Sequence, residues 1–299
     1  MSAGTARIWA PVIASALVMA GCSTPAEPEP ADVVPTAIAE DATLLTATSP
    51  DFPPAQFRAP FEFQGLQAGE VTGFEAELVE AVADELGLSV QWVDVPFEQV
   101  LEQVSTGAAD VAASAVTVTD ERSDDFTFVT FFETGTQWAV REPNVAGVRP
   151  NDACGARVAV QSGTVAADDL AARSAACEQA GEEPIDIREF ASQNEVTAAL
   201  IAGIVNAFAA DAPAVRWAIR QSGNPSATSS LNTNRLVPAG PPYDVASYGW
   251  AVSDPDLAQA LLEGLQAVVD SGEYLEILQR WGVDEGALEP DEIRGVEQG

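Results

Sequence analysis

Helical and strand patterns alternate through the first half of this chain, and that alternation most constrains the fold. Apolar residues recur at four-residue spacing over residues 74–86 and Gly87 follows, which predicts an amphipathic helix ended by a glycine. A mostly buried strand is predicted over residues 90–95, a second helix over 97–104 and another strand over 110–116. Strands that alternate with helices in this order predict a parallel sheet.

A second alternating unit begins near residue 157. Its predicted strands cover residues 157–161, 185–190 and 205–210, and its predicted helices cover about 164–176, 194–202 and 213–221. Two helical patterns, over residues 257–269 and 273–281, follow near the end of the chain. At 299 residues the chain is long enough for two domains that each have a core, so we expect two α/β lobes.

Polar residues gather where the predicted strands end. Ligands of parallel α/β sheets bind beyond the carboxyl ends of the strands, and Ser114, Thr117 and Arg122 follow the strand predicted over 110–116. The fork-shaped guanidinium of Arg122 suits a carboxylate. Asp211 also ends a predicted strand, where the simplest role for an aspartate is to cap the helix that follows.

Composition excludes several classes of function. The chain carries 46 acidic residues against 13 basic ones, for a formal net charge of −33, and all the basic residues are arginine. This charge has the wrong sign for nucleic acid, and its simplest explanation is a soluble, solvated surface. Without histidine or lysine, the chain has no Ser-His-Asp triad, histidine metal site, Schiff base or P-loop. We therefore expect neither a metal nor a cofactor.

The N-terminus carries the pattern of an export signal. Arg7 precedes an apolar run over residues 8–20 that is too short for a comfortable transmembrane helix. Small residues before Cys22 favour a lipoprotein signal peptide over residues 1–21, with an ordinary secretory signal as the alternative. Residues 22–41 are rich in Pro, Ala and Glu and predict a disordered tether.

Cys154 and Cys177 are the other cysteines of the chain. An even pair of cysteines in an exported protein most simply forms a disulfide. Metal binding or thiol catalysis would need further ligands or a base, which this pair does not supply.

Four short segments, taken together and in order, resemble a known family. The segments are Gly73-Phe74-Glu75-Ala76-Glu77-Leu78, Pro96-Phe97-Glu98, residues 114–122, and Tyr248-Gly249-Trp250-Ala251-Val252. They are similar to the amino-acid-binding subfamily of bacterial ABC-transporter solute-binding proteins, the family 3 extracellular solute-binding lipoproteins. The resemblance covers roughly residues 42–283 and implies a two-lobed, type II periplasmic-binding-protein-like α/β fold with the ligand cleft between the lobes.

The resemblance also implies where the lobes begin and end. Lobe I is expected at residues 42–134 and 249–285, and lobe II at residues 135–248. Hinge crossings are expected near residues 132–137 and 243–248. The acidic tail, residues 286–299, is expected to be loose.

Roles within the cleft follow from the same resemblance. It implies that Arg122 and Thr117 hold the α-carboxylate of an amino acid, that Asp211 receives the α-ammonium, and that Phe52 and Phe97 sandwich the side chain. The full set of residues expected at the ligand is Phe52, Phe97, Ser114, Ala115, Thr117, Arg122, Gln161, Thr164 and Asp211. Because the two poles come from different lobes, ligand binding is expected to close the cleft by a hinge motion.

Departures from the family pattern bear on the choice of ligand. An insertion between Pro53 and Gly69 disturbs the segment after Phe52. Ser49 stands where some binders of basic side chains place an aspartate, and Gln161 occupies a position that can touch the distal group of a ligand. A small, neutral, polar amino acid is therefore expected.

The expected function is that of an exported lipoprotein that captures an amino acid and delivers it to an ABC importer. Lipid on Cys22 is expected to anchor a monomer to the outer face of the cytoplasmic membrane, or within the periplasm, and no enzymatic activity is expected. Two alternatives stay open. One is a binder of a compatible solute such as ectoine, which the six tryptophans allow. The other is a cyclohexadienyl-dehydratase-like enzyme on the same scaffold, which needs a general acid in the cleft.

Overall fold

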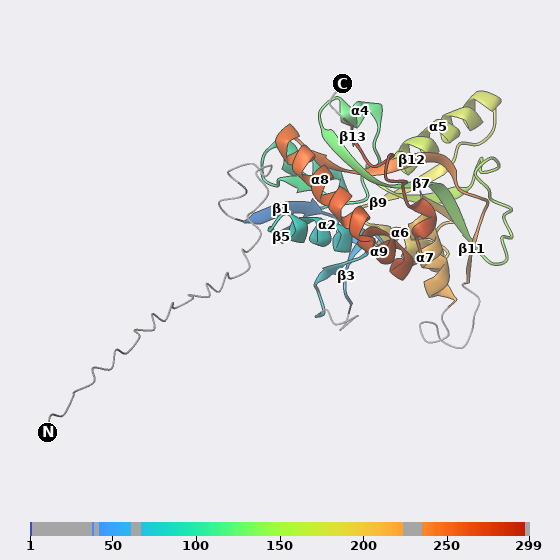
Figure 1. Ribbon diagram of the computed structural model, residues 1–299. Coiled ribbons are helices and arrows are strands. Elements are labelled where there is room, and N and C mark those ends of the chain that lie inside the picture. The colour runs from blue at the N-terminus through green and yellow to red at the C-terminus, as the bar shows by residue number, and fades with distance from the viewer. Residues whose placement is uncertain (2–37, 39–41, 61–66, 224–234, 297–299) are drawn as a thin grey trace.

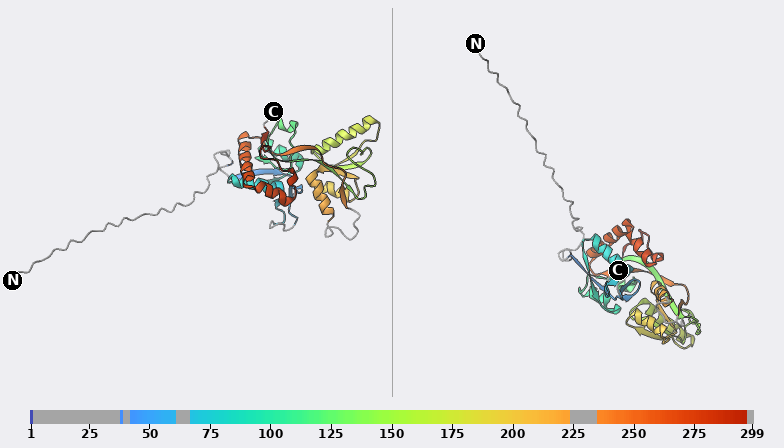
Figure 2. Two further views of the ribbon diagram at one scale, coloured as in Figure 1. Left: turned by 45° about the vertical axis from the view of Figure 1, so that its right-hand side comes forward. Right: turned by 90° about the horizontal axis from the view of Figure 1, so that it is seen from below.

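The computed structural model describes residues 1, 38, 42–60, 67–223 and 235–296 of the chain. They form two α/β lobes that lie side by side and are joined by two long strands (Figures 1 and 2). The predicted signal peptide after Met1, Cys22 and most of the predicted tether fall outside these residues. Among the described helices, none is both long and apolar enough to cross a membrane.

Parallel strands form the centre of lobe I, as the helix and strand alternation predicted. Its elements are β1 (Thr43–Thr48), α2 (Phe74–Glu85), β5 (Ser89–Asp94), α3 (Val100–Ser105) and β6 (Val111–Ala112). β1 lies between β5 and β6 and is parallel to both. The expectation of a mostly buried strand over residues 90–95 is wrong. β5 is the edge of the sheet, so its residues are exposed or only partly buried.

Lobe II repeats this arrangement. Its elements are β8 (Arg157–Gln161), α5 (Val165–Ala180), β9 (Asp186–Phe190), α6 (Gln193–Ile201), β10 (Ala207–Asp211) and α7 (Ala212–Ser222). β8 lies between β9 and β10 and is parallel to both. Each of these elements lies within a few residues of its predicted bounds, because apolar strands and amphipathic helices alternate clearly here.

Shorter elements surround the two half-sheets. They are β2 (Asp51–Phe52), β3 (Gln56–Arg58), β4 (Val71–Thr72), η1 (Phe97–Gln99), α4 (Asp120–Ser123) and β11 (Leu236–Pro238). β2, β3 and β4 form a separate antiparallel sheet. The segment suspected of carrying an insertion lies in this small sheet, apart from residues 61–66, which fall outside the described chain.

Two long antiparallel strands, β7 (Thr127–Arg141) and β12 (Tyr243–Val252), run through both lobes. The first part of β7 pairs with the end of β12, and its last part pairs with β10 of lobe II. The pairing is irregular at two points between Tyr243 and Gly249. A Cβ atom on Gly135 would lie 2.5 Å from the carbonyl oxygen of Tyr243, so the crossing requires glycine. This irregular stretch coincides with the expected hinge crossings, while the hinge motion itself stays a prediction.

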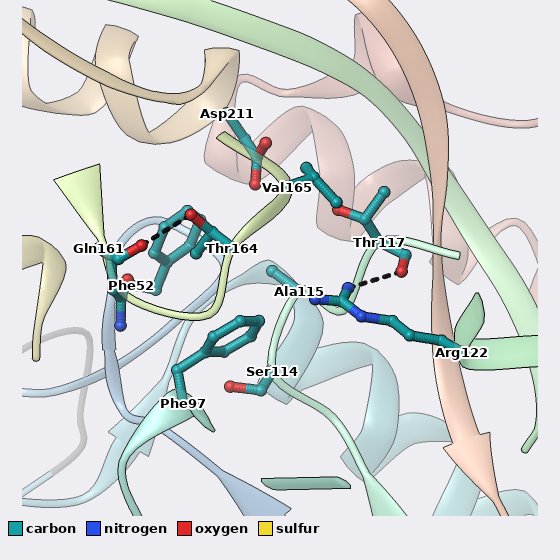
Figure 3. A pocket seen from close by; sticks show the side chains of 10 residues that line it. All are labelled: Phe52, Phe97, Ser114, Ala115, Thr117, Arg122, Gln161, Thr164, Val165 and Asp211. Carbon is teal, nitrogen blue, oxygen red and sulfur yellow. Dashed lines mark hydrogen bonds between the residues drawn. The ribbon is translucent and has the colours of Figure 1, made fainter. Parts of the chain in front are cut away.

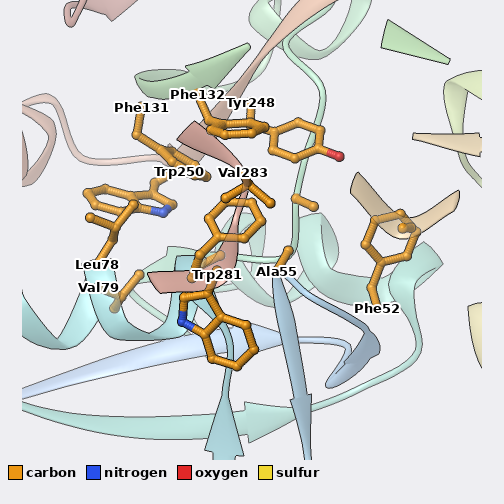
Figure 4. Packing of buried hydrophobic residues seen from close by; sticks show 14 of the residues in the cluster. Phe52, Ala55, Leu78, Val79, Phe131, Phe132, Tyr248, Trp250, Trp281 and Val283 are labelled. Atoms are coloured by element: carbon orange, nitrogen blue, oxygen red, sulfur yellow. The ribbon is translucent and has the colours of Figure 1, made fainter. Parts of the chain in front are cut away.

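Aromatic pairs join the two crossing strands within the core of lobe I (Figure 4). The rings of Phe131 and Trp250 stack with centroids 4.9 Å apart, and those of Phe132 and Tyr248 stack at 5.6 Å. All four side chains are fully buried. Such pairs contribute about 0.5–1.5 kcal/mol each beyond the burial of area. The ring of Tyr248 is therefore fixed from the lobe I side.

The last helices and the tail cover lobe I. α8 (Pro255–Ser271) and α9 (Glu273–Trp281) form where predicted, and the short helix η2 (Asp284–Gly286) follows them. The expectation of a loose tail is wrong for its described part. Leu288 and Ile293 are buried, and β13 (Gly295–Val296) pairs with β7. The acidic composition of the tail predicted a loose segment, although its few apolar residues pack against lobe I.

A disulfide joins Cys154 to Cys177 in lobe II, as predicted. We expect the Cys154→Ser/Cys177→Ser double variant to lose roughly 3 kcal/mol of unfolding free energy, because the bridge restricts the unfolded chain across a separation of 23 residues. Urea denaturation of the oxidised wild type and of the variant measures this loss. Since neither cysteine lines the cleft, ligand affinity should not change. Equal unfolding free energies would contradict a stabilising bridge.

Candidate functional site

The nine residues expected at the ligand line one cavity between the lobes, together with Val165 (Figure 3). The empty space among these residues, open solvent included, is about 270 Å³. Lobe I contributes Phe52, Phe97, Ser114, Ala115, Thr117 and Arg122, and lobe II contributes Gln161, Thr164, Val165 and Asp211. Strand ends of the two half-sheets therefore face one another across the cavity. That these side chains contact a ligand stays a prediction.

The lobe I side of the cavity is formed by backbone that leaves the sheet before the predicted end of the strand. The strand predicted over residues 110–116 ends at Ala112, and Ala115 adopts a left-handed φ of 52°, which a strand cannot include. The carboxyl group of Glu75 on α2 holds this turn by accepting the amide hydrogen of Ala115 at 2.6 Å. Burial raises the pKa of Glu75 to about 8, so this group is mainly protonated at neutral pH.

The guanidinium of Arg122 is oriented by contacts from both lobes. The residue lies on α4, whose N-cap Thr119 accepts the amide hydrogen of Arg122 at 3.2 Å. Nη1 donates to the carbonyl oxygen of Thr117 at 2.8 Å, and Nη2 donates to that of Gly163 in lobe II at 3.1 Å. Cζ lies 5.9 Å from the centroid of the Phe97 ring. A guanidinium has five N–H donors, so these two bonds leave donors for a carboxylate.

Asp211 does not cap α7 through its side chain. It occupies the N-cap position, yet its side chain makes no capping hydrogen bond to the helix. Its Oδ2 instead accepts the hydroxyl hydrogen of Tyr248 at 2.7 Å. Tyr248, which the expected bounds placed at the end of lobe II, packs against Phe132 in the aromatic core of lobe I, so this bond links the lobes at the cavity. The simple capping explanation for Asp211 is therefore wrong.

Burial perturbs both charged groups of the cavity. It lowers the pKa of Arg122, while the negative charges of Asp168 and Asp211 oppose that effect. It raises the pKa of Asp211 to about 6, opposed by the hydroxyl of Tyr248 and the charge of Arg122. Asp211 is therefore mainly ionised at neutral pH. Loss of water is the main cause of both pKa shifts, because it destabilises the charged form of each group. A ligand that places an opposite charge beside each group would offset this destabilisation.

The sequence analysis missed residues at the end of the cavity opposite Arg122, next to Gln161 (Figure 3). Asp51 on β2 is close to the side chain of Gln161 but lines neither cavity, and its Oδ1 accepts the hydroxyl hydrogen of Ser49 at 3.2 Å. Burial raises the pKa of Asp51 to about 6. A second, smaller cavity adjoins this end and reaches Gln193 on α6. Nothing in the sequence pattern marks Gln193, because only the folded chain brings α6 to the cleft.

A glycine sets how closely the lobes approach. Gly163 has a φ of +74°, and a Cβ atom there would lie 2.8 Å from Cγ of Glu98 in lobe I. We expect Gly163→Ala to weaken ligand binding about tenfold, because the added methyl group overpacks the closed cleft. Gly181→Ala is the matched control, since Gly181 has a φ of +75° and no atom within 4 Å of its Cβ position.

Calorimetric titration of the two glycine variants measures this effect. Adding Glu98→Ala to Gly163→Ala should restore most of the lost affinity, because it removes the Cγ atom that the new methyl group meets. Equal affinities for Gly163→Ala and Gly181→Ala would show that this contact does not limit closure.

Comparison with known proteins agrees with this geometry. Residues 46–284 match the model of the bacterial extracellular solute-binding proteins, family 3. Arginine-binding protein ArgT of Corynebacterium glutamicum is 34% identical over 295 residues, which cover 93% of this chain and 91% of ArgT. L-cystine-binding protein TcyJ of Escherichia coli is 30% identical over 129 residues, 42% of this chain and 46% of TcyJ.

A similar solved structure is that of a mutant of ArgBP from T. maritima. It has a TM-score of 0.70 and 25% sequence identity, and the match covers 83% of this chain and 98% of that one. The two-lobed fold, the cavity between its lobes and the family match over most of the chain agree. This chain belongs to family 3 of the bacterial extracellular solute-binding proteins.

Proposed function

We propose that this protein holds an L-α-amino acid between Arg122, which binds the α-carboxylate, and Asp211, which binds the α-ammonium. As a family member it is an extracytoplasmic amino-acid-binding protein of an ABC importer. One observation carries the proposal of the two poles. A guanidinium from lobe I and a carboxylate from lobe II line the same small cavity.

The charges of a zwitterion explain why both lobes are needed. An unpaired charge costs several kcal/mol once it is removed from water, so both poles must be met in a closed cleft. Arg122 offers a bidentate fork to the carboxylate. Ser114 already accepts two hydrogen bonds from lobe I, which leaves its own hydroxyl hydrogen to donate to the same group. Oδ2 of Asp211 accepts from Tyr248, and Oδ1 is left to accept from the ammonium.

L-arginine is the first ligand to test. The relative that aligns with 93% of this chain is named for arginine, whereas TcyJ, which matches a shorter stretch, is named for L-cystine. Membership of the family therefore leaves the side chain of the ligand open. The neutral, polar amino acid expected from Ser49 stays a competing prediction.

Binding without chemistry fits the cleft better than the dehydratase alternative. That alternative needs a general acid, whereas Asp211, the carboxyl group of the cavity lining, already accepts the hydroxyl hydrogen of Tyr248 and lies in the same cavity as Arg122. An ionised carboxylate that faces Arg122 suits a receptor for a zwitterion. NMR spectra of each bound ligand after prolonged incubation should show it unchanged, and turnover would favour the enzyme.

The compatible-solute alternative loses the support that the tryptophans lent it. Phe52 and Phe97 are the aromatic residues of the cavity lining, which includes no described tryptophan. Trp138, Trp250 and Trp281 are buried in the cores instead. An ectoine-like solute would find fewer aromatic faces here than that function requires.

A thermal-shift screen tests the proposal. A ligand that binds only the folded protein adds about 2.7 kcal/mol at ~100 times its dissociation constant. We expect a shift with an L-amino acid and a much smaller shift with its decarboxylated analogue, because that analogue lacks the carboxylate pole. Agmatine, which is arginine without the carboxylate, is the sharpest comparison if arginine binds. The absence of a shift with all twenty amino acids would defeat the proposal.

We also propose that lipid on Cys22 anchors the protein to the membrane. The proposal rests on the apolar run before Cys22 and on the tether that follows. We expect Cys22→Ser to move the protein from the membrane fraction to the soluble fraction, because serine lacks the thiol that carries the lipid. Fractionation without detergent measures this, with the Cys154→Ser/Cys177→Ser variant as the control. Unchanged membrane retention of Cys22→Ser would count against the anchor.

A further inference from the structure

We infer that an aromatic cluster outside the cavity raises ligand affinity by holding the two lobes in the closed arrangement. The cluster consists of Phe57 on β3 and Trp281 at the end of α9 in lobe I, and of Trp217 on α7 in lobe II. None of the three lines the cavity. This interlobe aromatic cluster would therefore act on every ligand that binds the closed cleft, whichever groups hold that ligand.

The three rings contact one another across the boundary between the lobes, where α7 lies beside α9 (Figure 1). The ring centroid of Trp217 lies 5.5 Å from that of Phe57 and 6.1 Å from that of Trp281. Phe57 and Trp281 meet edge to face at 5.7 Å. These two side chains are 8% and 5% exposed, whereas Trp217 is only partly buried. Lobe II thus covers an aromatic pair of lobe I with the side chain of Trp217.

Two arginines of α7 accompany Trp217. Arg216 forms an ion pair with Glu285 of η2 in lobe I, and both side chains are well exposed. Exposed ion pairs contribute little, so this pair does not hold the lobes together by itself. The guanidinium carbon of Arg220 lies 5.8 Å from the centroid of the Trp217 ring. This cation–π contact is within lobe II and helps to orient the ring toward lobe I.

The cluster and the cavity are carried by the same pieces of chain. α7 follows Asp211 directly, so Trp217 moves with that aspartate. Phe52 of the cavity pairs with Gln56, the neighbour of Phe57 on β3. None of the three aromatic residues belongs to β7 or β12, the strands that cross between the lobes. A motion that withdraws Asp211 from lobe I would therefore withdraw Trp217 from Phe57 and expose apolar area on both.

Contacts at the cavity identify the structure as the closed arrangement. Arg122 of lobe I donates to the carbonyl oxygen of Gly163 in lobe II at 3.1 Å. Tyr248 donates to Asp211 at 2.7 Å. The aromatic cluster is formed together with these contacts, so its burial adds to the stability of the closed form.

The segment that carries Phe57 departs from the family pattern. It lies between Pro53 and Gly69, where an insertion disturbs the sequence. β3 pairs with β2 on one side and with β4 on the other, which fixes the position of Phe57. The segment therefore supplies part of the lobe I surface that receives Trp217.

The size of the effect follows from the population of the closed form. The apparent affinity of a ligand that binds only the closed form falls in proportion to the closed fraction. A contact between two aromatic rings corresponds to a factor of about two to ten in an equilibrium constant. We expect Trp217→Leu, which removes two interlobe ring contacts, to weaken the binding of each ligand about five- to fiftyfold. Trp217→Phe keeps an aromatic ring and should retain most of the affinity.

Calorimetric titration with two amino acids of different side chain measures this loss. The factor should be the same for both, because Trp217 does not line the cavity, and it should arise from faster dissociation. Trp92→Leu is the matched control, since Trp92 is also partly buried but lies on β5 at the edge of the lobe I sheet. Melting temperatures show that each variant is folded. Phe57→Leu, which removes the contact with Trp217 from the other lobe, replaces Trp217→Leu if that variant does not fold.

Small-angle X-ray scattering gives a measurement that needs no ligand. The ligand-free Trp217→Leu variant should have a larger radius of gyration than the wild type, and Trp92→Leu should match the wild type. Unchanged affinity in Trp217→Leu, or losses that differ between the two ligands, would overturn the role of the cluster and leave the poles at Arg122 and Asp211 in place. If no amino acid binds, the proposed function fails, and an unchanged radius of gyration would then overturn the cluster as well.

Discussion

Arg122→Ala and Asp211→Asn each lower amino-acid affinity by about thirtyfold to several thousandfold, which corresponds to about 2–5 kcal/mol. Each variant leaves one pole of a desolvated zwitterion without its partner. Much of the loss is the cost of that unpaired charge in the closed cleft. Calorimetric titration with the best ligand from the thermal-shift screen measures the change. Near wild-type affinity in both variants would refute the proposed poles.

Measurements of folding stability distinguish the loss of a ligand contact from a general disruption of the fold. The pKa of Asp211 is raised from its ordinary value to about 6 in the folded protein, so the fold loses stability as the pH rises through that range. Asp211→Asn removes this cost, and its ligand-free melting temperature at pH 7 should equal or exceed that of the wild type. Lower affinity in a more stable protein would show that Asp211 serves binding at the expense of stability.

Charged residues away from the cleft provide matched controls. Arg58→Ala removes an arginine that pairs with Asp94 on the exposed surface of lobe I. Asp186→Asn removes an aspartate that pairs with Arg188 on the surface of lobe II. Neither residue lines the cavity, so both variants should bind like the wild type. A loss of affinity in these controls would indicate that the overall charge of the protein, and not direct contact of Arg122 or Asp211 with the ligand, governs binding.

The placement of the cavity residues follows from features that a sequence displays. Ser114 and Thr117 follow the last strand of the lobe I half-sheet, and Asp211 ends a strand of the lobe II half-sheet. Local pattern and strand order were enough to mark Ser114, Thr117 and Arg122 as candidates. The family resemblance was needed for Phe52, Phe97 and the ligand role of Asp211.

The errors arise where contacts distant in sequence decide the outcome. Ala115 leaves the sheet because Glu75, forty residues away, holds its amide. β5 becomes an edge because no strand follows it in the sheet order, which its apolar residues cannot signal. Gln193 reaches the cleft only through the packing of α6. In each case the residue type is compatible with several environments, and the fold selects one.

Lowering the pH from 7 to 5 weakens amino-acid binding by about tenfold or more. In the proposed complex the α-ammonium of the ligand binds the ionised form of Asp211, whose pKa is about 6 in the folded protein. A group with that pKa is mostly ionised at pH 7 and about nine-tenths protonated at pH 5, so the competent fraction falls about tenfold.

Variants test whether this pH dependence belongs to Asp211. Asp211→Asn should bind weakly and should lose the dependence of affinity on pH in this range. Tyr248→Phe removes a hydroxyl that lowers the pKa of Asp211, so binding should begin to weaken at a higher pH. Protonation of Asp211 stabilises the fold, so unfolding through this group cannot account for weaker binding at pH 5. An affinity that stays constant between pH 7 and 5, with the protein folded throughout, would exclude an ionised Asp211 as the receptor for the ammonium.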